Sequence, residues 1–386
     1  MTERPPLALK SILFVALAAL VAAPTLAVGP LPFTTTHLVS GANLPLVNGA
    51  NLLAAVAGAG PNTLIKLEPG FYDLGGGQIN LPNFVDIEGS GRDITTIFSD
   101  LSASFTPTVI NVAAGINGEI RELTVSAASA GPTGIRSESN ELLLTEVNLE
   151  IESGDAGGIG VRIVNAESRL DEVFVRILGS TGNATGFLIE GGSPALTSCL
   201  FFASNVARNA TGIALDDSTA TIEGSILFSI FNGSNTGILV SGTATRATIR
   251  NTRGVIQGNR STGIQVQKLS NARVKESSFQ VRSDSSAVGI NLEDGTAKVT
   301  ESTFDVASLF TVSPNVWGAL LGGSSNLDSN QSNYESTSFA VQNNGTGQAR
   351  FGASQLIGAA VPAVLGPLVC IHAYNGVYTG LNNFCN

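Results

Sequence analysis

A small residue followed by alternating apolar positions recurs along most of the chain. The copies read Thr-Gly-Ile or a close variant, and their glycines are Gly134, Gly160, Gly186, Gly212, Gly237, Gly263, Gly289 and, in a weaker copy, Gly318. Successive glycines are 26, 26, 26, 25, 26, 26 and 29 residues apart. A register this constant indicates a repeat architecture, in which each copy is one structural unit stacked on the next.

Each repeat contains three strand-like pieces. The first and third residues after the glycine are apolar, as in Ile213 and Leu215, so alternation predicts a short strand with one face in a core. Two further apolar columns follow about ten and fifteen residues after the glycine, as at Leu170 and Val175. We therefore predict an all-β fold, a parallel β-helix solenoid of about 10–11 rungs. A leucine-rich solenoid would need a Leu/Asn framework that the repeat lacks.

The ends of the chain depart from the repeat. Residues 1–27 are predicted to be a secretory signal peptide, with a basic start and an apolar stretch from Ile12 to Ala23 that is too short to span a bilayer. Residues 28–61 form an N-terminal segment whose Asn48–Ala59 stretch predicts a capping helix, since a coil needs covers at its ends. The β-helix is assigned to residues 62–351 and a C-terminal cap to 352–386.

Cysteine usage agrees with export. Cys370 and Cys385 are close to the C-terminus and are predicted to form a disulfide. Cys199 aligns with an apolar column and is predicted to be a buried, inert thiol. Together with the signal segment, this predicts a secreted protein, extracellular or on the cell surface, with no membrane association after cleavage.

Residues 64–97 carry a resemblance to known proteins. In LIKLEPGFYDLGGGQINLPNFVDIEGSGRDITTI, Pro69, Gly70 and Tyr72 match a Pro-Gly-x-Tyr turn, and Gly89-Ser90-Gly91 match a Gly-rich turn. Both features resemble the opening of pectinesterase-type proteins of the pectin-lyase-like superfamily. The resemblance implies a right-handed parallel β-helix and a carbohydrate-related setting.

The resemblance does not extend to a catalytic motif. Pectinesterases carry a Val-Asp-Phe-Ile-Phe-Gly-like strand and a Gln-Asp motif, and pectate lyases an Arg-x-Pro-x-x-Arg strand, which are missing here. Of the polygalacturonase motifs, only an Asp-Asp pair is present, Asp216-Asp217, without a neighbouring His. A shared coil does not imply a shared activity.

The outward positions after the glycines place some ionisable residues on neighbouring rungs. Glu190 and Asp216 should be adjacent, with Arg162 one rung earlier, and Asp217 follows directly. Adjacent carboxylates raise each other's pKa and could act as an acid/base pair or bind Ca²⁺, the one cofactor the sequence suggests. The alternative is that Arg162, Glu190, Asp216 and Asp217 are solvated residues on an exposed sheet.

Charge is segregated along the chain, whose formal net charge is −10. A basic band, residues 236–282, has Glu276 as its acidic residue and includes the binding candidates Arg250, Arg253, Lys268, Arg273 and Lys275. Such a band could attract an anionic polysaccharide or cell-surface glycan, or could simply keep the surface soluble. Nucleic acid is not expected as a partner of an acidic, exported chain.

Two functions remain open at this point. One is a secreted β-helix protein that binds or degrades an acidic, pectin-like polysaccharide, as a lyase or hydrolase if it is an enzyme. The other is a non-catalytic structural or adhesive surface protein. A monomer is expected in either case.

Overall fold

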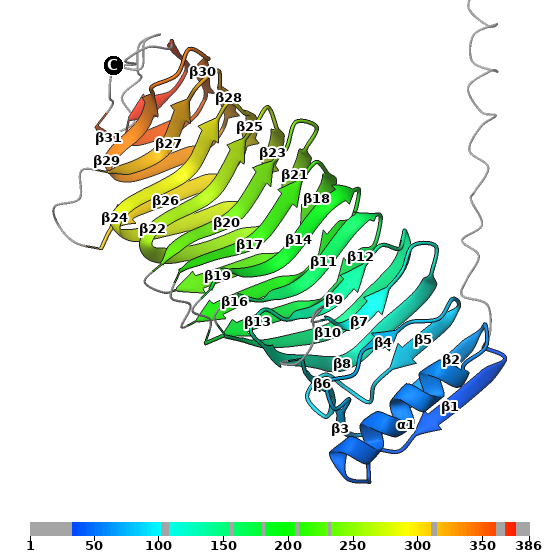
Figure 1. The fold of residues 1–386 in the computed structure, drawn as a ribbon. Helices are drawn as coiled ribbons and strands as arrows, with labels where there is room; N and C mark the ends of the chain where they lie inside the picture. Colours follow the sequence, from blue (N-terminus) through cyan, green and yellow to red (C-terminus); the bar gives the residue numbers. More distant parts are fainter. Residues whose placement is uncertain are drawn as a thin grey trace, which may run out of the picture. The chain divides into compact units, whose positions relative to one another are not determined.

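The computed structural model describes residues 33–101, 108–154, 157–179, 182–204, 208–230, 233–309, 315–359 and 367–375. They form a right-handed parallel β-helix of about 12 turns with one helix near the N-terminus (Figure 1). The predicted fold class is confirmed, and the coil is slightly longer than the 10–11 rungs expected. Residues 1–27, the predicted signal peptide, lie outside the described residues.

Each turn contributes strands to three faces, A, B and C in chain order, and each strand pairs in parallel with its counterpart on the next turn. Face A comprises β4 (Ile79–Asn80), β7 (Thr108–Val112), β9 (Thr133–Ser137), β11 (Ile159–Ala166), β14 (Ala184–Gly192), β17 (Asn209–Asp216), β20 (Ser234–Ser241) and β27 (Val316–Gly322). Face B comprises β1 (Thr35–Val39), β2 (Thr63–Leu67), β5 (Val85–Glu88), β12 (Arg169–Asp171), β15 (Ala195–Thr197), β18 (Thr219–Glu223), β21 (Arg246–Arg250), β23 (Asn271–Lys275), β25 (Thr296–Thr300), β28 (Asn326–Asn330), β30 (Ala349–Gly352) and β32 (Leu368–Ile371).

Face C comprises β3 (Gly70–Asp73), β6 (Thr95–Asp100), β13 (Phe174–Leu178), β16 (Leu200–Ser204), β19 (Ile226–Ile230), β26 (Thr303–Ser308), β31 (Gln355–Ala359) and β33 (Tyr374–Asn375). Five longer strands bend around a corner and serve two faces. Faces B and C share β8 (Asn117–Ser129) and β10 (Glu141–Ser153), and faces C and A share β22 (Arg253–Gln267), β24 (Ser278–Glu293) and β29 (Asn333–Asn343).

The interior consists of the apolar columns that the sequence pattern predicted. Leu170 and Val175, from faces B and C of one turn, are at most 1% exposed, as are their counterparts Leu196 and Phe201 on the next turn. Because side chains alternate along a strand, every second residue of each strand points into the core, where equivalent residues of successive turns stack in columns. Toward the C-terminal end, Phe279, Phe304 and Tyr334 stack with ring centroids 5.8 and 5.3 Å apart.

The recurrent glycine lies near the start of the face A strand, where neighbouring turns approach closely. A Cβ at Gly212 would lie 2.6 Å from the carbonyl oxygen of Gly237 and 3.1 Å from Leu227 Cδ2. The same clash with the next turn's carbonyl oxygen recurs at Gly186, Gly263 and Gly289, at 2.5–2.6 Å. The repeat signature is therefore a steric requirement of the stacking.

The corner between faces B and C needs one residue in the left-handed backbone region on nearly every turn. Glu122, Glu146 and Glu172 occupy it on successive turns, with φ of 54°, 53° and 52°. A side chain in this region meets its own carbonyl oxygen, which costs roughly 1–2 kcal/mol relative to the right-handed region. Their register also stacks three like charges along this corner.

We therefore expect Glu146→Gly to stabilise the fold by about 0.5–1 kcal/mol, because glycine adopts φ > 0 without strain. The increase should appear as a higher midpoint of thermal unfolding by circular dichroism. The matched control is Glu223→Gly in β18, where the backbone is extended and the same substitution should destabilise by a similar amount. A lower midpoint for Glu146→Gly would contradict the proposed strain.

Cys199 lies beside this corner in the column of Val147 and Val173, as expected. It is 1% exposed and unpaired, and desolvation by burial raises the pKa of its thiol to about 12. On later turns the column becomes a ladder of buried hydroxyls, at Ser225, Thr252, Ser277, Ser302, Ser332 and Ser354. The Cys199 N–H donates to Ser225 Oγ at 3.3 Å, so the thiol sits where the apolar column meets the hydroxyl ladder.

The helix α1 (Pro45–Gly58) covers the first turn, as predicted. It packs against β3 closely enough that a Cβ on Gly49 would lie 1.7 Å from the carbonyl oxygen of Asp73. The buried Asn48 side chain donates to the carbonyl oxygens of Gly41 and Phe71, both at 3.0 Å. No helix among the described residues has the length and apolar character needed to cross a membrane.

The motif Pro69-Gly70-x-Tyr72 builds the turn under this cap. Tyr72 is fully buried and its hydroxyl donates to the carbonyl oxygens of Val39 and Glu68, at 2.9 and 2.8 Å. Desolvation raises the pKa of Tyr72 to about 12. The tyrosine thus fastens the edge strand β1 to the first complete turn.

At the C-terminal end the coil extends into the segment assigned to a cap. β32 pairs with β30, and β33 with β31, so parallel ladders reach residues 374–375. Cys370 is buried on β32. Cys385 lies outside the described residues, so the Cys370–Cys385 disulfide stays a prediction.

Candidate functional site

The candidate catalytic residues lie on face A and its following turn. Arg162 on β11 donates from Nε to Glu190 Oε2 on β14 at 2.6 Å. Glu190 pairs in register with Asp216 on β17, as the spacing predicted. The structure thus brings Arg162, Glu190 and Asp216 together as neighbours on three successive turns.

Asp216 and Asp217 have local partners. Asp216 accepts a hydrogen bond from Ser241 Oγ at 3.0 Å, and Ser241 is only 7% exposed. Asp217 has φ of 47° and accepts the Ala244 N–H at 3.4 Å, which is the role of a turn residue. Neither residue lines the hollows described below. Within the described ranges, no three His, Cys, Asp or Glu side chains form a group that could hold a metal ion.

The basic band divides between faces. Arg250, Arg273 and Lys275 lie together on face B, at β21 and β23. Arg253 instead begins the face C part of β22, and Lys268 lies in the turn before β23 with φ of 56°. Three of the five predicted binding residues are therefore brought together and two are not.

Register reveals three cations of this surface that the sequence analysis missed as binding residues. Lys298 on β25 pairs with Arg273, Arg246 on β21 pairs with Asn271, and Arg350 on β30 pairs with Asp328. The repeat period was the available signal, because one turn of 25 residues separates Arg273 from Lys298. Lys298 and Arg350 lie beyond the basic band of residues 236–282 in the sequence, but they are on the same face of the solenoid.

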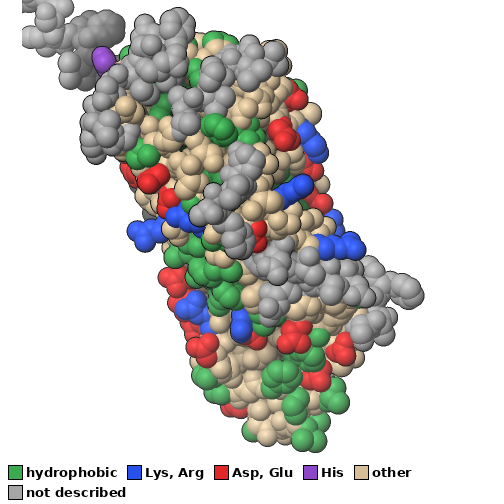
Figure 2. All heavy atoms as spheres, turned by 90° about the vertical axis from the view of Figure 1, so that its left-hand side faces the viewer, with side chains coloured by type: hydrophobic (Ala, Val, Ile, Leu, Met, Phe, Trp, Pro, Cys, Tyr) green, Lys and Arg blue, Asp and Glu red, His purple; other side chains and the backbone are tan. Residues whose placement is uncertain are grey.

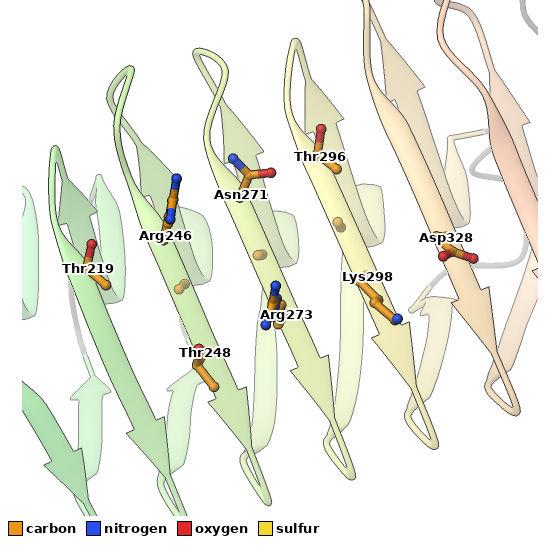
Figure 3. A pocket seen from close by; sticks show the side chains of 11 residues that line it. Thr219, Arg246, Thr248, Asn271, Arg273, Thr296, Lys298 and Asp328 are labelled. Carbon is orange, nitrogen blue, oxygen red and sulfur yellow. The ribbon is translucent and has the colours of Figure 1, made fainter.

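Face B is hollowed over β18, β21, β23, β25 and β28. The hollow has a volume of about 630 Å³, and Figure 3 shows its side chains projecting from successive strands in two rows. One row contains Thr219, Arg246, Asn271 and Thr296, and the other Thr248, Arg273, Lys298 and Asp328. Smaller hollows of about 290 and 250 Å³ share residues with it and add Arg250, Lys275 and Arg350. We call this continuous surface the basic groove.

Most cations of the basic groove have no counter-ion. Among the described residues, no carboxylate lies within 4.0 Å of a nitrogen of Arg246, Arg250, Arg273, Lys298 or Arg350. Lys275 is the exception, with Nζ 2.8 Å from Glu276 Oε1. This hydrogen bond raises the pKa of Lys275 and lowers that of Glu276.

The N-terminal part of the same face is arranged differently. There, Arg121 on β8 lies 2.6 Å from Glu88, which also contacts Lys66 at 2.7 Å. Partial burial acts to raise the pKa of Glu88, but the hydrogen bonds from Lys66 and Arg121 lower it overall. Burial also raises the pKa of Asp86, beside Arg121. Cations are neutralised within this network, whereas those of the basic groove are left open to solvent.

The register of the basic groove also places like charges side by side. Arg273 pairs with Lys298, and Arg250 with Lys275, on strands about 4.8 Å apart. Like charges directly opposite each other on a sheet are destabilising by a few tenths of a kcal/mol. The cations occur on β21, β23 and β25 and again on β30, beyond Asp328 of β28, so the charged surface runs about 20 Å along the solenoid axis.

Comparison with known proteins identifies the fold. No protein-family model matches the chain, and no curated protein matches its sequence. The A-module of the Azotobacter vinelandii mannuronan C-5 epimerase AlgE6 gives a TM-score of 0.57 at 13% identity, covering 87% of this chain and 99% of that one. The catalytic domain of a GH87 alpha-1,3-glucanase, in complex with tetrasaccharides, gives 0.53 at 10% identity, covering 90% and 69%. The chain is a right-handed parallel β-helix similar to both.

Proposed function

We propose that this protein binds an acidic polysaccharide outside the cell, with the polymer lying along the basic groove of face B. The observation that carries the proposal is the set of solvent-exposed cations without counter-ions, aligned over consecutive turns. A repeating anion is the complementary ligand, because its carboxylates can take the place of the missing counter-ions.

The polar neighbours of these cations suit a sugar polymer. Thr248, Asn271 and Thr296 line the groove between the charges and offer hydroxyl and amide groups for hydrogen bonds to sugar hydroxyls. An extended polymer would meet polar or charged groups at the same two register positions on each turn, since the turns repeat every 4.8 Å or so. The two similar structures reported above are, by their descriptions, a mannuronan epimerase and a glucanase, which is consistent with a carbohydrate ligand.

The stacked like charges support a role in binding over one in stability. Arg273 and Lys298 repel each other and stabilise no neighbour by an ion pair in the described part of the chain. Sites that bind ligands commonly retain such locally unfavourable arrangements. A surface that served solubility alone would gain from interspersed charges of both signs.

Whether the protein also cleaves its ligand rests on Arg162, Glu190, Asp216 and Asp217, which stay candidate catalytic residues. The close contact of Arg162 with Glu190 favours an ion pair between turns, worth at most about 1 kcal/mol at this exposure. The geometry therefore supports binding more directly than catalysis, and a non-catalytic adhesive function is compatible with the same groove.

The test is calorimetric titration of the purified protein with polygalacturonate and alginate oligomers. We expect binding that weakens with rising salt, and a loss of about 30-fold or more in affinity for the double variant Arg273→Thr/Lys298→Thr. Each charged hydrogen bond contributes on the order of 1 kcal/mol or more. The same variant should melt at a slightly higher temperature, because it removes a like-charge pair.

The matched control is Arg169→Thr, on the same face but three turns before β21. It removes one exposed cation outside the basic groove and should leave affinity within about twofold. Neutral dextran should not bind. Unchanged affinity of the double variant, or no binding of any anionic polymer, would refute the proposal.

A further inference from the structure

An apolar strip crosses face C midway along the solenoid, away from the basic groove. It consists of outward-facing side chains of β13, β16 and β19, namely Leu178, Leu200, Phe202, Ile226, Phe228 and Ile230. Ile226 and Ile230 are 43% and 37% exposed, and the other four are half-buried. Figure 2 shows hydrophobic side chains gathered midway along this side of the molecule.

Two aromatic rings of the strip stack on each other. Phe202 and Phe228 pair in register and stack with ring centroids 5.6 Å apart and planes 10° from parallel. Contiguous apolar surface of this kind is uncommon on monomeric soluble proteins and usually marks an interaction site. A flat sheet face is also suited to packing against another sheet, at about 10 Å.

Charges of opposite sign flank the strip along the solenoid axis. Toward the N-terminal end, β10 carries Glu150 and Glu152 on face C. Toward the C-terminal end, Arg253 on β22 and Arg282 on β24 occupy the same face. Glu152 and Arg253 are both exposed. Arg176 lies 3.7 Å from Glu150, and Asp305 on β26 lies 2.6 Å from Arg282. Within the described part of the chain, one acidic charge (Glu152) and one basic charge (Arg253) are therefore left unpaired on the two sides of the strip.

We propose that face C is a homodimer interface, in which two copies pack face to face with their solenoid axes antiparallel. A two-fold axis parallel to the strands, between β16 and β19, generates this arrangement. It places Leu200 over Ile226 of the partner subunit, and Phe202 over Phe228 of the partner subunit. The part of the apolar strip on β16 and β19 covers its own copy, as an isologous interface requires.

Charge complementarity selects this antiparallel arrangement. It lays β10 over the partner's β24, so Glu152 faces Arg282 of the partner subunit, which also contacts Asp305 of its own chain at 2.6 Å, and the reverse pair forms at the other end. A two-fold axis along the solenoid would instead lay each turn over itself. Glu150 and Arg176 would then each face their own copies, and like charges across an interface are strongly unfavourable.

The dimer would leave face B open in both copies. It does not depend on the proposed polysaccharide binding, and either proposal can fail while the other holds. It departs from the monomer expected from sequence, because the strip's residues become contiguous only in the folded coil.

The first experiment is sedimentation equilibrium of the purified protein from about 1 to 100 μM. We expect twice the monomer mass in wild type and a loss of about 100-fold or more in dimer affinity for Phe228→Asp. Glu152→Lys, an exposed substitution that leaves the core intact, should weaken the dimer about tenfold. Leu269→Asp is the control, a 65% exposed leucine in a turn outside the strip, and should remain dimeric.

The geometry is tested separately by cross-linking. Asn148→Cys on β10 and Ser278→Cys on β24 are made as single variants and treated with a short bismaleimide, alone and mixed. These residues share one register position five turns apart, so each faces the other across the interface but is displaced from its own copy by about 24 Å along the solenoid axis. The antiparallel interface predicts strong cross-linking in the mixture and little in either variant alone. Monomeric wild type at 100 μM, or cross-linking of each variant to itself, would overturn the proposal.

Discussion

Replacing Gly212 by alanine is expected to destabilise the fold by about 2–3 kcal/mol, although it adds only one methyl group. The new Cβ would lie 2.6 Å from the carbonyl oxygen of Gly237 on the next turn. Because that atom belongs to the backbone of a paired strand, the clash is relieved only by moving the two turns apart. Overpacking of a rigid interior costs on the order of 1–3 kcal/mol, and this site has little freedom to relax.

The measurement is the midpoint of thermal and urea unfolding, compared between Gly212→Ala and Gly58→Ala. Gly58 ends the helix α1, and nothing lies within 4 Å of the position of its Cβ. There the same substitution should be neutral or stabilising by up to about 1 kcal/mol. If both variants melted alike, the glycine column would reflect turn preference and not close stacking.

Truncation of Phe304 to alanine is expected to cost still more, about 3–5 kcal/mol. Its ring is fully buried between Phe279 and Tyr334, with planes within 11° and 13° of parallel. Removing it leaves a cavity and breaks two aromatic contacts at once. Tyr334, whose hydroxyl donates to Ser329 Oγ at 3.0 Å, would lose the ring that holds it in place.

The control for this variant is Phe71→Ala on β3. Phe71 also contacts a second phenylalanine, Phe98, at 5.5 Å, but is 42% exposed. Its truncation should cost on the order of 1 kcal/mol, since much of its surface is already in water. Urea midpoints of the two variants give the comparison. A loss for Phe304→Ala no larger than for Phe71→Ala would show that the C-terminal turns are loosely packed.

The positions of the candidate catalytic residues could be predicted from the sequence better than those of the candidate binding residues. The period placed Glu190 beside Asp216 and Arg162 one turn earlier, and the structure bears this out. It also put Cys199 in the core. The basic band, by contrast, was defined as a continuous stretch of sequence, without assigning its residues to faces of the solenoid. Arg253 fell on another face, and Lys298 was missed although it lies one turn after Arg273.

The sequence by itself determined the coil. Its period, apolar columns and glycine column specify parallel stacking, because each is a local consequence of alternation along a strand and of close approach between turns. Only the tertiary structure decided which outward residues share a face and what they meet there. An ion pair between turns depends on register and side-chain direction. For this reason Arg162 forms an ion pair with Glu190, whereas Arg273 pairs in register with another cation, Lys298. Amino-acid composition does not reveal whether a cation has an acidic neighbour on the next turn. This is what distinguishes the basic groove from the parts of the surface where charges are paired.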